Sequence, residues 1–211
     1  GNSIEQNGYS GENLSRYGDV VFCSVNHRLN AFGFSDFSKV GGEAFKNSGN
    51  VGLLDIIAAL RWVHDNIENF GGDPSNVTII GQSGGGSKVS AIATMPLAKG
   101  LIHKAVALSG NSVKAGDPEY SAALGAFILE EAGLEPSEIG VLQEMPWEDY
   151  LELANRAVAK FNQQYEGQSI RGGFGPVADG IVLPDDIYFN ANDPSIRSEE
   201  HTSELQSPNT I

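Results

Sequence analysis

Residues 76–86 read Asn-Val-Thr-Ile-Ile-Gly-Gln-Ser-Gly-Gly-Gly, a short run of β-branched residues followed directly by the pattern Gly-x-Ser-x-Gly centred on Ser83. A strand that ends in this pattern and continues into a helix of small residues is the sequence form of a nucleophile elbow. Serine is a weak nucleophile at its free pKa, so such a turn must aim the hydroxyl at a base and at a substrate carbonyl. The stretch therefore predicts that Ser83 is a nucleophile.

The glycines around this serine predict how tightly the chain turns. Gly81 and Gly85 lie two residues on either side of it, where we expect any Cβ to collide with the neighbouring strand or helix. Gly84 would offer its backbone N–H as one donor of an oxyanion hole at the start of the helix. The alternative is a glycine-rich turn that cradles phosphate, but Ser87-Lys88 reverses the Lys-Ser/Thr order of a Walker motif.

Composition places the chain among globular proteins. Its 211 residues are 40% hydrophobic and 19% charged, enough to form the core of one domain. A net charge of −14 argues against nucleic-acid or anionic-membrane partners. The single cysteine, Cys23, excludes an internal disulfide, and we expect it to be a small core residue on a buried strand. No apolar stretch is long enough to span a bilayer.

Hydrophobic periodicity predicts alternating strands and helices. We expect a buried strand at residues 19–26, a helix at 53–70, the strand that ends at the serine, a helix up to about 95 and a strand at 104–109. Such alternation predicts a parallel α/β sheet, whose active residues lie at the carboxyl ends of its strands.

The second half of the chain predicts two further helices. Asp117-Pro118 starts one helix, which Gly133 ends. The next helix covers residues 147–165. Its expected apolar face consists of Trp147, Leu151, Ala154, Val158 and Phe161.

Several runs together resemble the type-B carboxylesterase family, which includes bacterial para-nitrobenzyl esterases and animal cholinesterases. They include VNHRLNAFGF (25–34), GNVGLLD (49–55), NIENFGGDPSNVT (66–78), the serine elbow and FGPVADG (174–180). The resemblance covers residues 1–193. It implies an α/β-hydrolase fold, here an incomplete parallel sheet with flanking helices. It also implies hydrolysis of carboxylic esters by a Ser-acid-His triad through an acyl-enzyme, without a metal or an organic cofactor.

The resemblance also assigns roles to single residues. It makes Ser83 the nucleophile and Gly84 an oxyanion donor. Ser109 matches a family serine near the catalytic histidine, so it either supports the site or is an ordinary strand-end serine. Arg28 and Asp55 match a structural charged pair. Cholinesterases have glutamate where this chain has Gln82, and the neutral amide argues against choline esters.

The remaining triad members are missing from the expected positions. In this fold the acid and then the histidine follow the serine. His103 matches no catalytic position and is expected to be a surface or hydrogen-bonded histidine, as are His27 and His64. Asp179 precedes a glycine and predicts a turn. Asp185 is the other candidate acid, but the family's acid is expected further downstream.

The sequence predicts that a longer parent protein is represented here by residues 1–196. Residues 197–211 resemble a translated sequencing adapter, so His201 would not complete a triad. The family's His-Gly-Gly loop and the strand before it would lie ahead of residue 1. Each buried backbone hydrogen bond lost with that strand costs about 1–3 kcal/mol, against a domain stability of about 5–15 kcal/mol. We therefore expect the chain alone to be unstable or molten.

Two functions from different classes fit these observations. The first is a serine carboxylic ester hydrolase, with Ser83 as nucleophile in the parent and little activity in this chain. The second is a non-catalytic adhesion or binding module, because one fold can serve both purposes. An intact Gly-x-Ser-x-Gly favours the enzyme, since a binding module does not need a strained nucleophile turn. Localisation and oligomeric state are not predicted.

Overall fold

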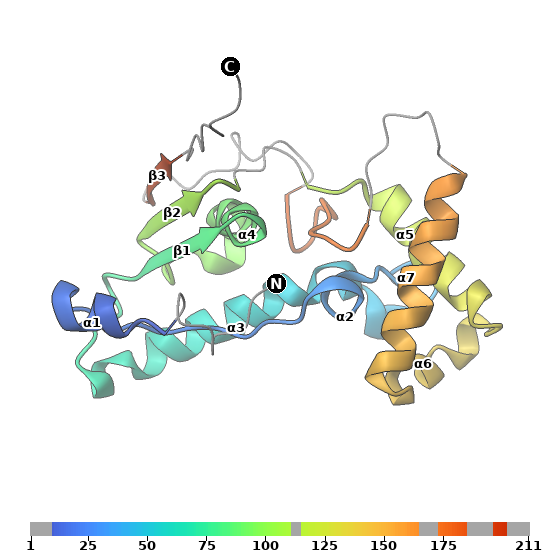
Figure 1. Cartoon of the computed structure of the whole chain (residues 1–211), viewed down its shortest axis with the longest axis horizontal. Coiled ribbons are helices and arrows are strands. Elements are labelled where there is room, and N and C mark those ends of the chain that lie inside the picture. Colours follow the sequence, from blue (N-terminus) through green and yellow to red (C-terminus); the bar gives the residue numbers. More distant parts are fainter. Residues whose placement is uncertain (1–9, 111–114, 165–172, 185–195, 202–211) are drawn as a thin grey trace, which may run out of the picture.

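A small parallel sheet and a group of helices form the two sides of the molecule in the computed structural model (Figure 1). The structure describes residues 10–110, 115–164, 173–184 and 196–201. We call α5 (Pro118–Glu131), α6 (Gly140–Glu144) and α7 (Trp147–Gln163) the helical region. The sheet with α3 (Val51–Asn66) and α4 (Gly84–Thr94) is the sheet region. None of the described helices combines the length and the hydropathy that a membrane span requires.

The sheet has three parallel strands in the order β1 (Thr78–Gln82), β2 (Lys104–Leu108) and β3 (Arg197–His201). The predicted strand, helix and strand around the serine are confirmed as β1, α4 and β2. β1 and β2 are in register from Thr78 opposite Lys104 to Gln82 opposite Leu108. The carboxyl ends of both strands therefore lie side by side, where an α/β sheet carries its site.

The strand expected at residues 19–26 is not formed. This segment follows α1 (Glu12–Gly18) as chain without regular structure and runs past α3 (Figure 1). Val20 is 51% exposed, and Cys23 is exposed instead of buried. A strand exists only by pairing with a neighbour, and none of the described strands pairs with this segment. The segment is apolar, but an apolar run is buried as a strand only where another strand pairs with it.

The helix predicted at residues 53–70 is confirmed as α3 followed by the 3-10 turn η4 (Ile67–Phe70). Gly71 ends it at a φ of 82°, a conformation that glycine adopts without strain. The short helix α2 (Asn30–Phe34) lies ahead of α3 in the chain. The buried aromatic residues Phe34 and Phe37 anchor this part of the protein. The other short 3-10 turns are η2 (Glu43–Phe45), η3 (Ser48–Asn50), η5 (Pro96–Ala98) and η6 (Pro136–Glu138).

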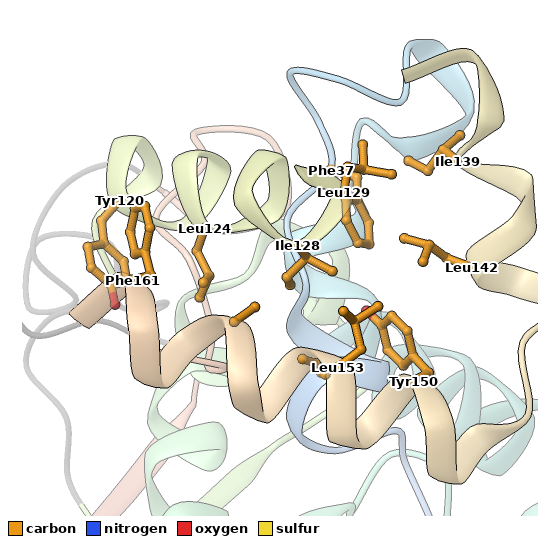
Figure 2. Packing of buried hydrophobic residues seen from close by; sticks show 13 residues of the cluster. Phe37, Tyr120, Leu124, Ile128, Leu129, Ile139, Leu142, Tyr150, Leu153 and Phe161 are labelled. Carbon is orange, nitrogen blue, oxygen red and sulfur yellow. The ribbon is translucent and has the colours of Figure 1, made fainter. Parts of the chain in front are cut away.

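The helical region packs α5 against α7. Asp117 caps α5 by accepting a hydrogen bond from the N–H of Tyr120 at 2.9 Å, as the Asp-Pro start predicts. In Figure 2, Leu124 and Ile128 of α5 face α7. The face predicted for α7 is wrong at its start, because Trp147 is 61% exposed. Ala154 and Phe161 are buried as predicted, and Tyr150, Leu153 and Ala157 complete the buried face.

A fully buried asparagine attaches residues 173–184 to the rest of the protein. Asn50 donates to Val177 O at 2.8 Å and to Asp179 Oδ2 at 2.9 Å, and its Oδ1 accepts from Val177 N at 2.9 Å. Buried amide groups are costly unless paired, so these three bonds define the position of the segment. Val182 and Leu183 then fill the same core as α3 and α4.

β3 lies within residues 197–211, the segment that resembles a translated sequencing adapter. Residues 197–201 pair in parallel with β2, from Lys104 opposite Arg197 to Leu108 opposite His201. Backbone amides make these bonds whatever the side chains are. The presence of β3 therefore does not test the adapter origin of residues 197–211, which stays a prediction.

Candidate active site

Ser83 lies at the junction of β1 and α4, as the sequence predicts. Its φ of 53° and ψ of −121° lie outside the usual regions for a residue with a Cβ. Ser83 is exposed, so the packed core does not cover it. Such backbone strain persists only where the surrounding structure enforces it, and it is concentrated at functional sites.

Hydrogen bonds tie this turn to the end of β2. Ser83 N donates to Leu108 O at 2.8 Å, and Ser83 O accepts from Ser87 N at 3.0 Å. Ser87 Oγ donates to Gly110 O at 2.5 Å. The serine backbone is thus held by both the strand beside it and the helix after it.

Close backbone approaches explain some of the glycines. A Cβ on Gly81 would lie 2.4 Å from the carbonyl carbon and oxygen of Gly85, so the expected collision at Gly81 is confirmed. A Cβ on Gly110 would lie 1.7 Å from Ser83 O, which makes this glycine the tightest neighbour of the turn. On Gly86 it would lie 3.1 Å from Leu108 O. Both positions let β2 and α4 approach closely.

The expected collision at Gly85 is wrong. A Cβ added there meets nothing within 4 Å, because this position faces open space on the first turn of α4. The backbone of Gly85, and not its missing side chain, is what Gly81 accommodates. The second glycine of the Gly-x-Ser-x-Gly pattern is therefore dispensable sterically, whereas Gly86 is not.

The two residues beside Ser83 are both exposed. Gly84 is the first residue of α4, and the first N–H groups of a helix have no carbonyl partner within it. Gln82 ends β1 and brings no charge to the site. The turn can thus present a backbone donor to a developing oxyanion beside the serine hydroxyl.

Ser109 lies beside Ser83 at the end of the neighbouring strand. Gln82 and Leu108 are paired in the sheet, so the next residues, Ser83 and Ser109, leave it together. Ser109 is exposed and also has a positive φ, 49°. Two strained serines at adjacent strand ends favour a supporting role for Ser109, which stays a prediction.

Lys88 is a half-buried cation on α4, the helix that follows Ser83. Lys88 Nζ donates to Gly84 O at 3.2 Å and lies 5.6 Å from the centre of the Phe34 ring. Burial lowers the pKa of this ammonium. Burial, and then the charge of Lys88, lower the pKa of His27, which therefore stays neutral at pH 7.

The predicted charged pair is confirmed. Arg28 donates from Nε and Nη2 to the two carboxylate oxygens of Asp55, at 2.9 Å and 2.6 Å, and its backbone N–H adds a third bond of 2.9 Å. The side-chain hydrogen bonds from Arg28 hold the pKa of Asp55 below its usual value. The pair joins the chain before α2 to α3.

The two described histidines away from the elbow have structural contacts. His103 Nδ1 accepts from Val77 N at 3.1 Å, which confirms a hydrogen-bonded histidine. His103 precedes β2, whereas Ser83 follows β1, so about five strand residues, or about 16 Å, separate the two ends. His64 contacts the neighbouring Asp65 on the surface. His201 belongs to β3, and its side chain lies outside the described part.

Asp179 forms the predicted turn. Its Oδ1 accepts from the backbone N–H groups of residues 181, 182 and 183, and Gly180 has a φ of 69°. Its Oδ2 accepts from Asn50 Nδ2. One carboxylate oxygen thus holds the turn, and the other attaches the turn to the rest of the protein. Asp185 lies outside the described residues.

Known proteins provide the family. A family model described as the carboxylesterase family matches residues 2–202. The chain belongs to the carboxylesterase family. The para-nitrobenzyl esterase of Bacillus subtilis (strain 168) is 41% identical over 148 residues, which are 70% of this chain and 29% of that one. Liver carboxylesterase 1F of Rattus norvegicus is 38% identical over 184 residues, 84% of this chain and 32% of that one.

Solved carboxylesterases share the fold. A thermophilic PNB esterase matches with a TM-score of 0.84 and 32% identity, over 100% of this chain and 44% of that one. An esterase from the anaerobe Clostridium hathewayi matches with a TM-score of 0.81 and 42% identity, over 96% and 40%. The predicted α/β-hydrolase fold with an incomplete sheet is therefore confirmed. The chain spans about a third of the length of these two curated relatives.

Sequence reasoning missed the structural role of Gly110 and the position of Lys88 at this carboxylesterase elbow. Gly110 could have been found, because Ser109-Gly110 follows a predicted strand next to the serine strand, where two turns must meet. Lys88 carried no comparable signal. Its reversed order relative to a Walker motif excluded one function without indicating another.

Proposed function

We propose that Ser83 is the nucleophile of a serine carboxylic ester hydrolase. The observation that carries this proposal is the exposed serine held at a φ of 53° between a strand and a helix. The hydrogen bond to Leu108 and the contact with Gly110 maintain this conformation, which has no packing purpose of its own. Membership of the carboxylesterase family supports the same chemistry.

In the proposed reaction, Ser83 Oγ attacks the ester carbonyl carbon while its proton passes to a base. Gly84 N–H stabilises the oxyanion of the tetrahedral intermediate. The intermediate collapses to an acyl-serine as the alcohol leaves with the proton. Water then attacks the acyl-serine and releases the acid. The base is expected to be a histidine of the longer parent, so we expect little turnover by this chain.

Gln82 narrows the proposed substrates. Its amide leaves the residue before Ser83 without charge, and the ammonium of Lys88 bonds the carbonyl oxygen of Gly84, the residue after Ser83. A site with this charge does not favour the quaternary ammonium group of choline esters. We therefore propose ester substrates without a cationic alcohol.

Labelling of the longer parent protein with a serine-directed phosphonate tests the proposal, because the base that activates Ser83 is expected there. We expect one adduct on Ser83, located by mass spectrometry, and none on the Ser83→Ala variant. Ser75 is a matched control, because it is also an exposed serine in a turn, held by Asp73. The Ser75→Ala variant should label like the original chain. An adduct distributed over several serines would contradict the proposal.

A binding module is the second candidate. Neuroligin-2 of Rattus norvegicus, which is not named as an esterase, is 35% identical over 185 residues, 85% of this chain and 20% of that one. Similar identity to both kinds of protein leaves the serine turn as the discriminating feature. Absence of a phosphonate adduct on Ser83 in the parent protein would favour the binding module. Rapid turnover of a para-nitrophenyl ester by this chain, lost in Ser83→Ala, would show that the base is supplied here.

A further inference from the structure

The side chain of Lys88 reaches back along α4 toward the turn that holds Ser83. Lys88 is the fifth residue of this helix, and its Nζ bonds the carbonyl oxygen of the first, Gly84. The Nζ lies 3.9 Å from the place that a Cβ on Gly84 would occupy. The ammonium is thus beside the residue whose N–H is the proposed oxyanion donor.

No carboxylate within the described ranges lies within 4 Å of this ammonium. Its surroundings are the ring of Phe34 and the neutral imidazole of His27. Asp55 is near His27, but its two oxygens already accept from Arg28. A half-buried charge without a counterion is unfavourable, and this chain has 27 acidic residues against 13 Lys and Arg. The missing counterion is therefore not due to a shortage of carboxylates.

His27 has a ring nitrogen without a hydrogen-bond partner among the described residues. His27 Nε2 is buried and makes no hydrogen bond with any described residue. Buried polar atoms in native proteins are nearly always paired, so this nitrogen has an unused capacity for one hydrogen bond. The charge of Lys88 contributes to the lowered pKa of this same imidazole.

We propose that Lys88 is a specificity-determining residue that favours esters carrying a carboxylate. The inference rests on the proposed role of Ser83 and names the substrate class for that site. The lysine ammonium is a compact point charge, whereas arginine presents a planar fork of donors that matches phosphate. A ligand group with a single negative charge therefore suits Lys88. A carboxylate at about 7 Å in an effective dielectric of about 40 would gain a preference of about five- to tenfold.

The test compares two phosphonate probes of equal length on the longer parent protein, where the base for Ser83 is expected. One probe ends in a carboxylate and the other in its methyl ester. We expect the carboxylate probe to label Ser83 about five- to tenfold faster. This ratio should fall to about one in Lys88→Met, remain in Lys88→Arg, and decrease at high salt. An equal ratio in the original chain and in Lys88→Met would overturn the inference while leaving Ser83 as the nucleophile.

A binding measurement decides the inference if neither probe labels Ser83. Lysine side chains are dimethylated with ¹³C and observed by NMR while monomethyl glutarate is added. We expect the Lys88 signal, assigned by its loss in Lys88→Met, to shift with the monoester and not with dimethyl glutarate. No shift, or the same shift with both compounds, would overturn the inference. Failure of labelling alone rejects the proposed nucleophile and not the anion preference.

Discussion

The helical region and the sheet region bury their apolar side chains by different routes. In the helical region, Ile128, Ala154 and Ala157 are completely buried, in a cluster formed mostly by helices within one stretch of about fifty residues. Figure 2 shows Ile128 of α5 above α7. In the sheet region, none of the five residues of β1 is buried, whereas Ala105 and Ala107 of β2 are. A helix satisfies its own backbone and needs one packing partner, but a strand needs neighbours on both sides.

The largest expected effect tests this comparison with one substitution in each region. Ile128→Ala should lower the free energy of unfolding of the helical region by about 2–5 kcal/mol, because it leaves a cavity between α5 and α7. Ile80→Ala in β1, at a residue 54% exposed, should change it by no more than about 0.5 kcal/mol.

Urea denaturation followed by amide hydrogen exchange would measure both changes. The Ile80→Ala variant is the control, since it removes the same atoms from an exposed site. Equal destabilisation by the two variants would show that β1 is as well covered as α5, and the comparison would fail.

A smaller effect is expected at the serine turn. Gly110→Ala should destabilise the sheet region by about 1–3 kcal/mol, because the new Cβ would overlap Ser83 O. It should also slow phosphonate labelling of Ser83 by displacing the turn. Gly85→Ala should stabilise α4 by about 0.5–1 kcal/mol, since its Cβ meets open space within a helix.

Thermal unfolding and labelling rates of these two variants distinguish a required glycine from a permitted one. Both add one methyl group to the same turn, so their opposite signs isolate the contact with Ser83. Destabilisation by Gly85→Ala comparable to that by Gly110→Ala would contradict the steric explanation.

The smallest effect separates the two regions by pH. Asp55 has a lowered pKa in the folded state, so its pair with Arg28 stabilises the sheet region above the ordinary value of 3.8 and less as the pH falls below it. Tyr150 donates to Ser35 Oγ at 2.8 Å, and burial raises its pKa. Its contribution is therefore present below pH 10.0 and is lost as the pH rises above it.

We expect Asp55→Asn to cost about 0.5–1 kcal/mol at pH 7, and this difference to shrink toward pH 3. Tyr150→Phe should cost about 1 kcal/mol at pH 7 and remove part of the loss of stability above pH 10. Unfolding curves across the pH range measure both. A pH dependence unchanged in either variant would assign the titration to other groups.

The same difference decides what the sequence could predict. α3, α5 and the cap at Asp117 were predictable because helix signals are local. The strand at residues 19–26 was not, since its apolar run reports a tendency and not a partner. In α7, the periodicity indicated the helix but placed Trp147 on the buried face, because the packing of α5 selects that face.

At the candidate site, the sequence placed Ser83 and Gly81 correctly within the turn. It missed Gly110, although Ser109-Gly110 follows the predicted strand beside the serine strand, because the approach of 1.7 Å between a Gly110 Cβ and Ser83 O spans two strands. It also could not assign Lys88, since the absence of a counterion is a property of the surroundings. Contacts between segments distant in the chain are what a local pattern does not contain.

Asn50 has a consequence for synthesis on the ribosome. Its side-chain amide is completely enclosed, yet every hydrogen-bond partner of this amide among the described residues lies 127 or 129 positions later. A nascent chain that has not yet delivered Val177 must leave this side-chain amide hydrated, so the core around α3 cannot close before Val177 has left the ribosome. Chaperones that hold emerging polypeptides would therefore encounter that surface open until Val177 emerges.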